Sequence, residues 1–342
     1  MTLLGIYYIM ELYVYGKGRN MKKISIGVQE NKRATSRFGN LSFKSQIPLL
    51  TMLLPGAILV FMFSYMPMFG IILAFKKINL RQGIFGSPWY GLKNFEYLLK
   101  SSDLCIMLRN TIGYNLIFVI FGMVFGVTLA VGLSLVRQKR VSKTYQTIMI
   151  MPHFLSMIII SYLVLAFLNM ENGFLNKVIL PIFGMDPVNW YVDKRPWPFI
   201  LIFVHFWKEM GYSSIVYLSS IAGIDSQLYE AAAIDGATTW QRIKHITLPL
   251  LRPIMAIQLT LGVGKVLGGD FGLFYQVPMD SGAISDVTVT IPVYVYKNLS
   301  SGGAAALGVA SATSFIQSVF GFMLVLLTNA AVNKIDSDSA LF

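Results

Sequence analysis

The chain has 342 residues, of which 55% are hydrophobic and only 13% are charged. Soluble domains carry about 25% charged residues, so this composition argues against a soluble protein and predicts a polytopic helical membrane protein. The single cysteine, Cys105, excludes a disulfide framework within the chain and any multi-cysteine metal site. We interpret the net charge of +12 as basic loops at the cytoplasmic face, and not as a nucleic-acid surface.

Residues 1–46 hold eight of the 28 basic residues against two acids, Glu11 and Glu30, and are predicted to form a basic cytoplasmic segment. The apolar run at the start of the chain is interrupted by Glu11. The basic residues of the segment come after this run instead of before it. That order is unlike a secretory signal peptide. Translation starts either at Met1 or at Met21; the sequence does not decide between them.

Six long apolar stretches follow, each of about the 20 residues that a bilayer-spanning helix needs. They predict an all-α membrane domain at 47–332 and a short cytoplasmic tail at 333–342. Glycines within the second stretch permit close helix packing. Part of 287–296 is predicted to be either strand-like or a short re-entrant piece. The six spans are expected at about 47–75, 111–136, 147–169, 198–221, 250–268 and 309–332.

The distribution of Lys and Arg predicts the orientation. Four basic residues, Arg137, Lys139, Arg140 and Lys143, follow the second span within seven positions. Such clusters mark cytoplasmic loops. With six spans, both termini then lie inside a bacterial cytoplasmic membrane, Cys105 lies in the first external loop, and the loop at 223–249 lies inside.

That inner loop is a polar, helix-forming island between apolar runs. Glu230 is expected in the first turn of a helix, where a carboxylate favours the positive end of the dipole. Three alanines propagate the helix at little cost, and Gly236 interrupts it as a bend. A second short helix is expected to stop at Leu248-Pro249, because proline cannot continue a helix.

The loop reads EAA-x3-G-x9-I-x-LP, a spacing that resembles the signature loop of ABC-importer permease subunits. Flanking blocks, including 86–95, 109–111, 152–154 and 207–212, resemble oligosaccharide permeases. The resemblance covers about 48–332. It points to the type I carbohydrate-uptake group, of the multi-sugar or polysaccharide permease type. It implies the type I ABC importer permease fold with an ATPase-coupling loop whose residues are Glu230, Ala231, Ala232, Asp235, Gly236, Ala237, Ile246, Leu248 and Pro249.

The resemblance also implies the partners. A second homologous permease subunit would complete a heterodimer, two copies of an ABC ATPase would sit beneath, and an extracytoplasmic sugar-binding lipoprotein would deliver an oligosaccharide. The chain would be a transport subunit and not an enzyme, working by alternating access. It would bind no cofactor or metal and hold no catalytic residue, since ATP and Mg would lie on the ATPase.

Substrate-path candidates come from charges that interrupt the spans. Lys208, Glu209 and Lys265 stand where the family would be expected to have uncharged residues, and Tyr212 lies in the same block. Charges within a membrane are expensive and mark functional sites by default. An acidic oligosaccharide would suit either lysine. The alternative is that each lysine pairs with a carboxylate, Glu209 or Asp270. Adjacent residues do not share a helix face, so Lys208 and Glu209 are expected to meet different partners.

Other functions fit the sequence less well. The segment 262–265 reads GVGK but lacks the rest of a phosphate-binding loop, so the energy source is expected on another chain. The three histidines are too scattered to predict a metal site. Within the ABC family, an amino-acid or phosphate permease is the second possibility. An ion-coupled secondary carrier would have many spans but no reason to keep the glycine-containing loop. The identity of the sugar is not readable from the sequence.

Overall fold

The computed structural model describes residues 43–335, whose regular secondary structure is helical, with one isolated antiparallel bridge between Lys76 and Trp89 in place of a sheet. The predicted segments 1–42 and 336–342 lie outside the described residues. The helices are α2 Phe43–Val60, η1 Phe61–Tyr65, η2 Met66–Phe75, α3 Gly83–Gly86, α4 Lys93–Lys100, α5 Asp103–Ser134, α6 Lys139–Ile150, η3 Met151–Phe154, α7 Met157–Leu168, η4 Leu175–Ile179, α8 Leu180–Ile182, α9 Trp197–Ala222, α10 Ser226–Ile234, α11 Thr239–Arg242, η5 Ile243–Thr247, α12 Leu248–Gly264, α13 Phe271–Gln276, η6 Gly282–Ile284, α14 Ser285–Thr288, α15 Ile291–Ser300 and α16 Ala304–Ile335.

The chain divides into two compact units at Gly70. The first contains α2, η1 and the start of η2, which follow one another without a break. Pro55 lies inside α2, and Pro67 lies in the 3-10 segment η2. Local π and 3-10 turns are a common way to accommodate the missing N–H of proline in a membrane helix. The second unit, Ile71 onward, holds all the other helices.

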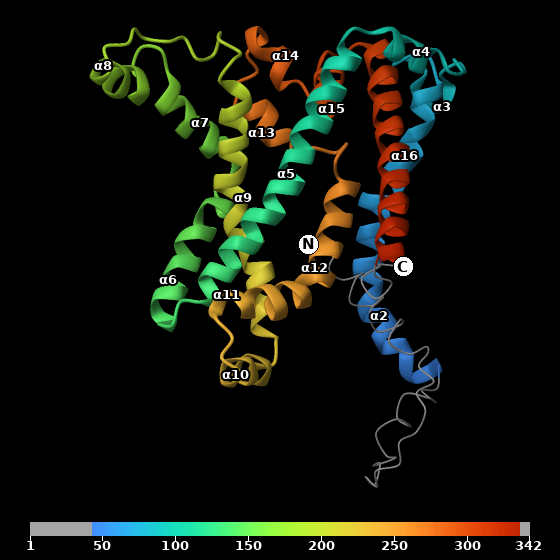
Figure 1. Cartoon of the computed structure of the whole chain (residues 1–342). Helices are drawn as coiled ribbons and strands as arrows, with labels where there is room; N and C mark the ends of the chain where they lie inside the picture. The colour runs from blue at the N-terminus through green and yellow to red at the C-terminus, as the bar shows by residue number, and fades with distance from the viewer. Residues whose placement is uncertain (1–42, 336–342) are drawn as a thin grey trace. The chain divides into compact units, whose positions relative to one another are not determined.

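The second unit is built on the pair α5 and α9 (Figure 1). The two helices approach closely at Gly126, where an added Cβ would lie 2.9 Å from a ring carbon of Tyr217. Tyr114 and Phe118 of α5 pack with Trp197 of α9 in one buried cluster. A second cluster, which includes Tyr217, joins the far ends of α5 and α9 to α12. Small and aromatic residues thus interlock along the whole pair.

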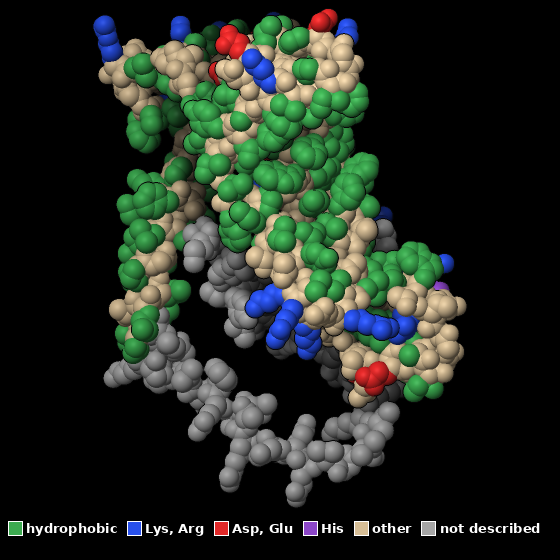
Figure 2. Space-filling model, turned by 90° about the vertical axis from the view of Figure 1, so that its left-hand side faces the viewer, with side chains coloured by type: hydrophobic (Ala, Val, Ile, Leu, Met, Phe, Trp, Pro, Cys, Tyr) green, Lys and Arg blue, Asp and Glu red, His purple; other side chains and the backbone are tan. Residues whose placement is uncertain are grey.

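The second unit has two ends, which its long helices connect. α10 and α11 lie at one end, together with the last turns of α5 and α9, and we refer to this as the α10–α11 end (Figure 1). The opposite end carries α4, α14, α15 and the first turns of α5 and α16. Figure 2 shows a face on which hydrophobic side chains cover the middle, with Lys and Arg side chains gathered above and below. This banding is expected of a protein that crosses a bilayer.

Four of the described helices are long and apolar enough to span a membrane: Leu50–Phe75, Asp103–Ser134, Thr239–Gly264 and Ala304–Lys334. A fifth is reached if Lys139–Phe154 and Met157–Leu168 count as one bent span. α9 has 26 residues, but Lys208 and Glu209 lower the hydropathy at its middle. All-α architecture with several spans is therefore confirmed, whereas the count of six stays a prediction.

The structure adds detail to three of the expected segments. The region of the third expected span, at about 147–169, is bent: Lys139–Phe154 and Met157–Leu168 meet at 95° across the break between Phe154 and Met157. α5 begins at Asp103, before the expected start of the second span near Thr111, since the helix continues beyond the bilayer-length apolar run into the polar residues before it. Most of 287–296 is helical, in α14 and α15, because Pro292 sits in the first turn of α15, where it needs no N–H partner. The strand-like alternative for this segment is therefore wrong, and the re-entrant alternative stays a prediction.

Candidate functional site

α10 begins four residues before Glu230. The Asp225 side chain caps it, accepting a hydrogen bond from the backbone N–H of Gln227 at 3.0 Å. Aspartate is a strong N-cap because it satisfies an N–H that has no partner within the helix. Glu230 therefore lies in the middle of α10 and not in its first turn, so the predicted helix-dipole contact is wrong. Its side chain is exposed, and it forms no ion pair among residues 43–335.

Gly236 ends α10 with φ of +80°, in the left-handed region that other residues adopt at a cost. The N–H of Gly236 bonds to the carbonyl of Ala233 at 3.1 Å, and the N–H of Ala237 bonds to that of Ala232 at 2.9 Å. This pair of bonds is a Schellman motif, which satisfies the last carbonyls of a helix. The predicted bend at Gly236 is thus present. An added Cβ there would meet no atom within 4 Å.

The helix that follows does not stop at Leu248-Pro249. A capping box between Thr238 and Gln241 starts α11, and the helix runs through the π-turn η5 into α12. Pro249 occupies the first turn of α12. The wider π hydrogen-bonding pattern just before it tolerates the missing proline N–H. The predicted stop is therefore wrong. Tyr229 of α10 shares a hydrogen bond of 2.9 Å with Thr247, which ties the two halves of the loop together.

A pocket of about 330 Å³ opens within this loop. Five of the nine predicted coupling residues line it, namely Ala232, Asp235, Gly236, Ala237 and Ile246. Glu230, Ala231, Leu248 and Pro249 do not. Three residues that the sequence did not single out, Gln241, Arg242 and His245, complete the lining. Gln241 and Arg242 lie about one turn before Ile246 and His245 lies directly before it, and only the fold brings these three side chains to the same pocket as Gly236.

The surface of the loop is unusually apolar for a segment predicted to lie outside the bilayer. Ile234 is 87% exposed and Trp240 is 69% exposed, and Leu228 is exposed as well. Exposed apolar side chains that cluster among polar ones mark sites of protein association. Together with the carboxylate of Glu230, which has no ion pair within residues 43–335, they form a surface suited to a protein partner.

A second cluster forms where α9 passes the break between α6 and α7. Lys208 is largely buried, with 13% of its side chain exposed, and its Nζ donates to the carbonyls of His153 at 2.7 Å and Leu155 at 3.2 Å. A sharp break leaves carbonyls without helical donors. The ammonium supplies those donors. Lys208 Nζ also lies 3.8 Å from Oε1 of Glu209, its neighbour on α9.

Glu209 meets the same break. Its Oε2 lies 3.0 Å from Nδ1 of His153, whose ring stacks on Tyr212 with centroids 4.6 Å apart. Lys208 and Glu209 thus converge on one segment, and the prediction of separate partners is wrong because the bend wraps around both faces. Sequence reasoning missed His153 as a member of the cluster: it lies 55 residues from Lys208, and no local spacing connects them.

The other candidates behave differently. Asp270 pairs with no lysine of the described segment 43–335; its Oδ1 caps α13 by accepting from the N–H of Leu273 at 3.1 Å. Lys265 follows the last residue of α12, is exposed, and has no ion-pair partner within residues 43–335. Tyr212 is also exposed. Lys208 thus donates to the carbonyls of the bend, whereas Lys265 forms no ion pair within the described residues.

Comparison with known proteins places this architecture. Residues 122–275 match the family model described as "Binding-protein-dependent transport system inner membrane component". The polygalacturonan/rhamnogalacturonan transport system permease protein of Bacillus subtilis (strain 168) is 31% identical over 287 residues, covering 84% of this chain and 88% of that protein. The trehalose/maltose transport system permease protein of Thermococcus litoralis is 27% identical, covering 80% of this chain and 88% of its own length.

Solved structures agree. A chain of a bacterial ABC transporter involved in the import of the acidic polysaccharide alginate superposes with a TM-score of 0.77 and 32% identity, covering 86% of this chain and 97% of that chain. A chain of the alginate transporter in complex with its alginate-pentasaccharide-bound periplasmic protein gives a TM-score of 0.76. The predicted resemblance is confirmed. This chain belongs to the binding-protein-dependent inner-membrane components, the multi-pass permease subunits of bacterial ABC transporters.

Proposed function

We propose that the chain is one of two permease subunits of an ATP-driven importer of an acidic oligosaccharide. The second permease, two copies of an ABC ATPase and an extracytoplasmic sugar-binding protein complete the transporter. ATP and Mg belong to the ATPase. The orientation is that predicted from the basic residues, with the α10–α11 end and both termini in the cytoplasm.

The surface of the α10–α11 loop carries the proposal of ATPase coupling. Ile234 and Trp240 expose apolar area that would be costly to leave in water, at about 25 cal/mol for each Å². The pocket behind Gly236 offers a concave counterpart to this surface. Because the Tyr229–Thr247 bond and η5 join the loop rigidly to α12, a push on α10 would move a membrane helix. This is the mechanical link that alternating access requires.

Two observations support an acidic substrate. The named relatives include permeases for polygalacturonan/rhamnogalacturonan and for alginate, an acidic polysaccharide. The chain itself presents Lys265 as an exposed cation that has no ion pair in the part of the chain that the structure describes. Among the substrate-path candidates, Lys265 and Tyr212 are assigned to the sugar, and Lys208 and Glu209 to holding the bend. Lys265→Gln should therefore lower uptake of trigalacturonate several-fold with little change in protein abundance.

The coupling role is tested by Gly236→Asp and Glu230→Lys. Each variant should keep near-normal abundance in the membrane, lose ATP-driven uptake, and retain less ATPase on purification. Gly302→Asp is the matched control: Gly302 also has a positive φ, of 69°, and open space around it, but it lies at the opposite end. The Gly302→Asp variant carries the same backbone strain as Gly236→Asp, about 1–2 kcal/mol, and the transporter that contains it should still take up the sugar. Full uptake and full ATPase retention in both loop variants would refute the assignment.

A further inference from the structure

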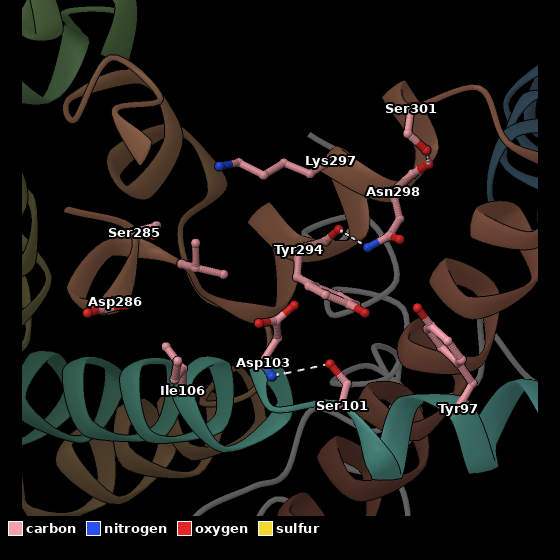
Figure 3. A pocket seen from close by; sticks show the side chains of 11 residues that line it. Tyr97, Ser101, Asp103, Ile106, Ser285, Asp286, Tyr294, Lys297, Asn298 and Ser301 are labelled. Carbon is pink, nitrogen blue, oxygen red and sulfur yellow. Dashed lines mark hydrogen bonds between the residues drawn. The ribbon is translucent and has the colours of Figure 1, made fainter. Parts of the chain in front are cut away.

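The end opposite α10–α11 contains a polar pocket of about 430 Å³ (Figure 3). The α4–α5 junction contributes Tyr97, Ser101 and Asp103 to its wall, and α15 contributes Tyr294 and Lys297. These elements are far apart in the sequence and meet only in the fold. The size falls within the range of ligand-binding pockets, about 300–1,000 Å³.

The pocket has three charged side chains, and two of them are already paired. Asp286 accepts from Lys194 at 2.9 Å, and Lys297 lies 2.5 Å from Asp280. Asp103 has no ion-pair partner among residues 43–335. The charge that remains for a ligand is therefore negative and centred on one carboxylate.

Aromatic rings flank this carboxylate. Figure 3 shows Asp103 beside the ring of Tyr294, with Tyr97 across the space. Burial raises the pKa of Tyr294, and the negative charge of Asp103 adds to the increase, so the field of Asp103 reaches into the pocket. A site with a carboxylate next to tyrosine rings attracts a cation through two interactions: charge–charge attraction to the carboxylate and cation–π attraction to the ring faces.

The same features disfavour the transported sugar as occupant. An acidic oligosaccharide would bring its carboxylates close to Asp103, and like charges repel. A basic side chain, in contrast, would place its charge at Asp103 and its alkyl stem along the tyrosines. In the orientation proposed above, the pocket faces the side from which a binding protein delivers the sugar.

We propose that this outer pocket receives a lysine or arginine side chain of the extracytoplasmic binding protein. The proposal rests on the proposed function, which supplies the partner and the orientation. It adds the residue of this chain, Asp103, that recognises the docked protein, and it gives the pocket a role distinct from the sugar path at Lys265.

The sole cysteine gives a direct binding test, because Cys105 is exposed and lies beside Asp103 and Ile106 of the pocket wall. The complete transporter, labelled at Cys105 with an environment-sensitive maleimide in phosphatidylglycerol nanodiscs, is titrated with tri-lysine. We expect a saturable, salt-sensitive response. Asp103→Asn should weaken it about five- to tenfold, which corresponds to about 1–1.4 kcal/mol. Glu96→Gln removes a nearby carboxylate that does not line the pocket and should leave the response unchanged.

A second arm uses the purified binding protein of the transporter. Asp103→Lys should raise the binding-protein concentration that half-maximally stimulates ATP hydrolysis at least fivefold, and Glu96→Lys should not. An unchanged value in Asp103→Lys would overturn the proposal. A Cys105 response to trigalacturonate that depends on Asp103 would also overturn the proposal. So would a tri-lysine response that disappears when phosphatidylethanolamine is present, because a lipid headgroup would then occupy the pocket. The tri-lysine arm needs neither ATP nor uptake, so its failure is distinguishable from failure of the proposed function.

Discussion

Lys208→Met should destabilise the protein by releasing the bend between α6 and α7. Methionine has a similar length but cannot donate hydrogen bonds, so the carbonyls of His153 and Leu155 lose their donor at 2.7 and 3.2 Å. A buried acceptor left unsatisfied costs about 1–3 kcal/mol. Both residues are only partly buried, and water can replace part of each bond. We therefore expect a total loss of about 2–3 kcal/mol, or about 30- to 150-fold in the unfolding equilibrium.

The assay is unfolding of the purified chain in detergent, followed by tryptophan fluorescence, with membrane abundance measured in parallel. Lys265→Met is the matched control, because Lys265 is exposed and unpaired within the described residues. Its effect should stay within about 0.5 kcal/mol. Equal stability of Lys208→Met and the wild type would refute the reasoning. It would show that Lys208 does not hold the bend and return it to the substrate path.

Three further predictions test other parts of the structure. Gly211→Ala should destabilise the chain by about 1–3 kcal/mol, because its Cβ would collide with the Met149 carbonyl of α6, whereas Gly113→Ala meets open space and should be neutral or stabilising by thermal unfolding. A membrane-impermeant maleimide should label Cys105 in intact cells, and labelling only after permeabilisation would invert the orientation. The hydrogen bond from Lys194 lowers the pKa of Asp286, so the stabilisation by this ion pair is present above the ordinary Asp pKa of about 3.9 and is lost as the pH falls below it. Wild type and Asp286→Asn should therefore differ in thermal stability at pH 7 and converge in acid. A difference that stays constant with pH would argue against the ion pair.

The features that could be predicted from the sequence are those that depend on residues close together along the chain. The glycine-terminated helix at Gly236 follows from a conformation that few other residues adopt, and the all-α membrane class follows from long apolar runs. The predicted position of Glu230 in the first turn of the helix is wrong, because Asp225 caps the helix and the helix therefore begins earlier in the chain. The predicted stop at Pro249 is wrong because the π-turn before it accommodates the missing proline N–H and the helix continues.

The bend between Phe154 and Met157 was beyond sequence reasoning for a different reason. It depends on a lysine 55 residues away whose ammonium satisfies the carbonyls of the break. Read alone, that lysine looks like a substrate-binding charge, and His153 looks like an isolated histidine. Only the packing of α9 against the break, with Gly211 allowing close approach, shows that the two residues act together.

Uptake into proteoliposomes tests the central claim most directly. The complete transporter is reconstituted with ATP inside and the binding protein outside, and radiolabelled trigalacturonate is added. We predict accumulation that requires both internal ATP and the binding protein, continues when ionophores collapse the ion gradients, and is lost in Gly236→Asp. Accumulation driven by an ion gradient without ATP would contradict the account.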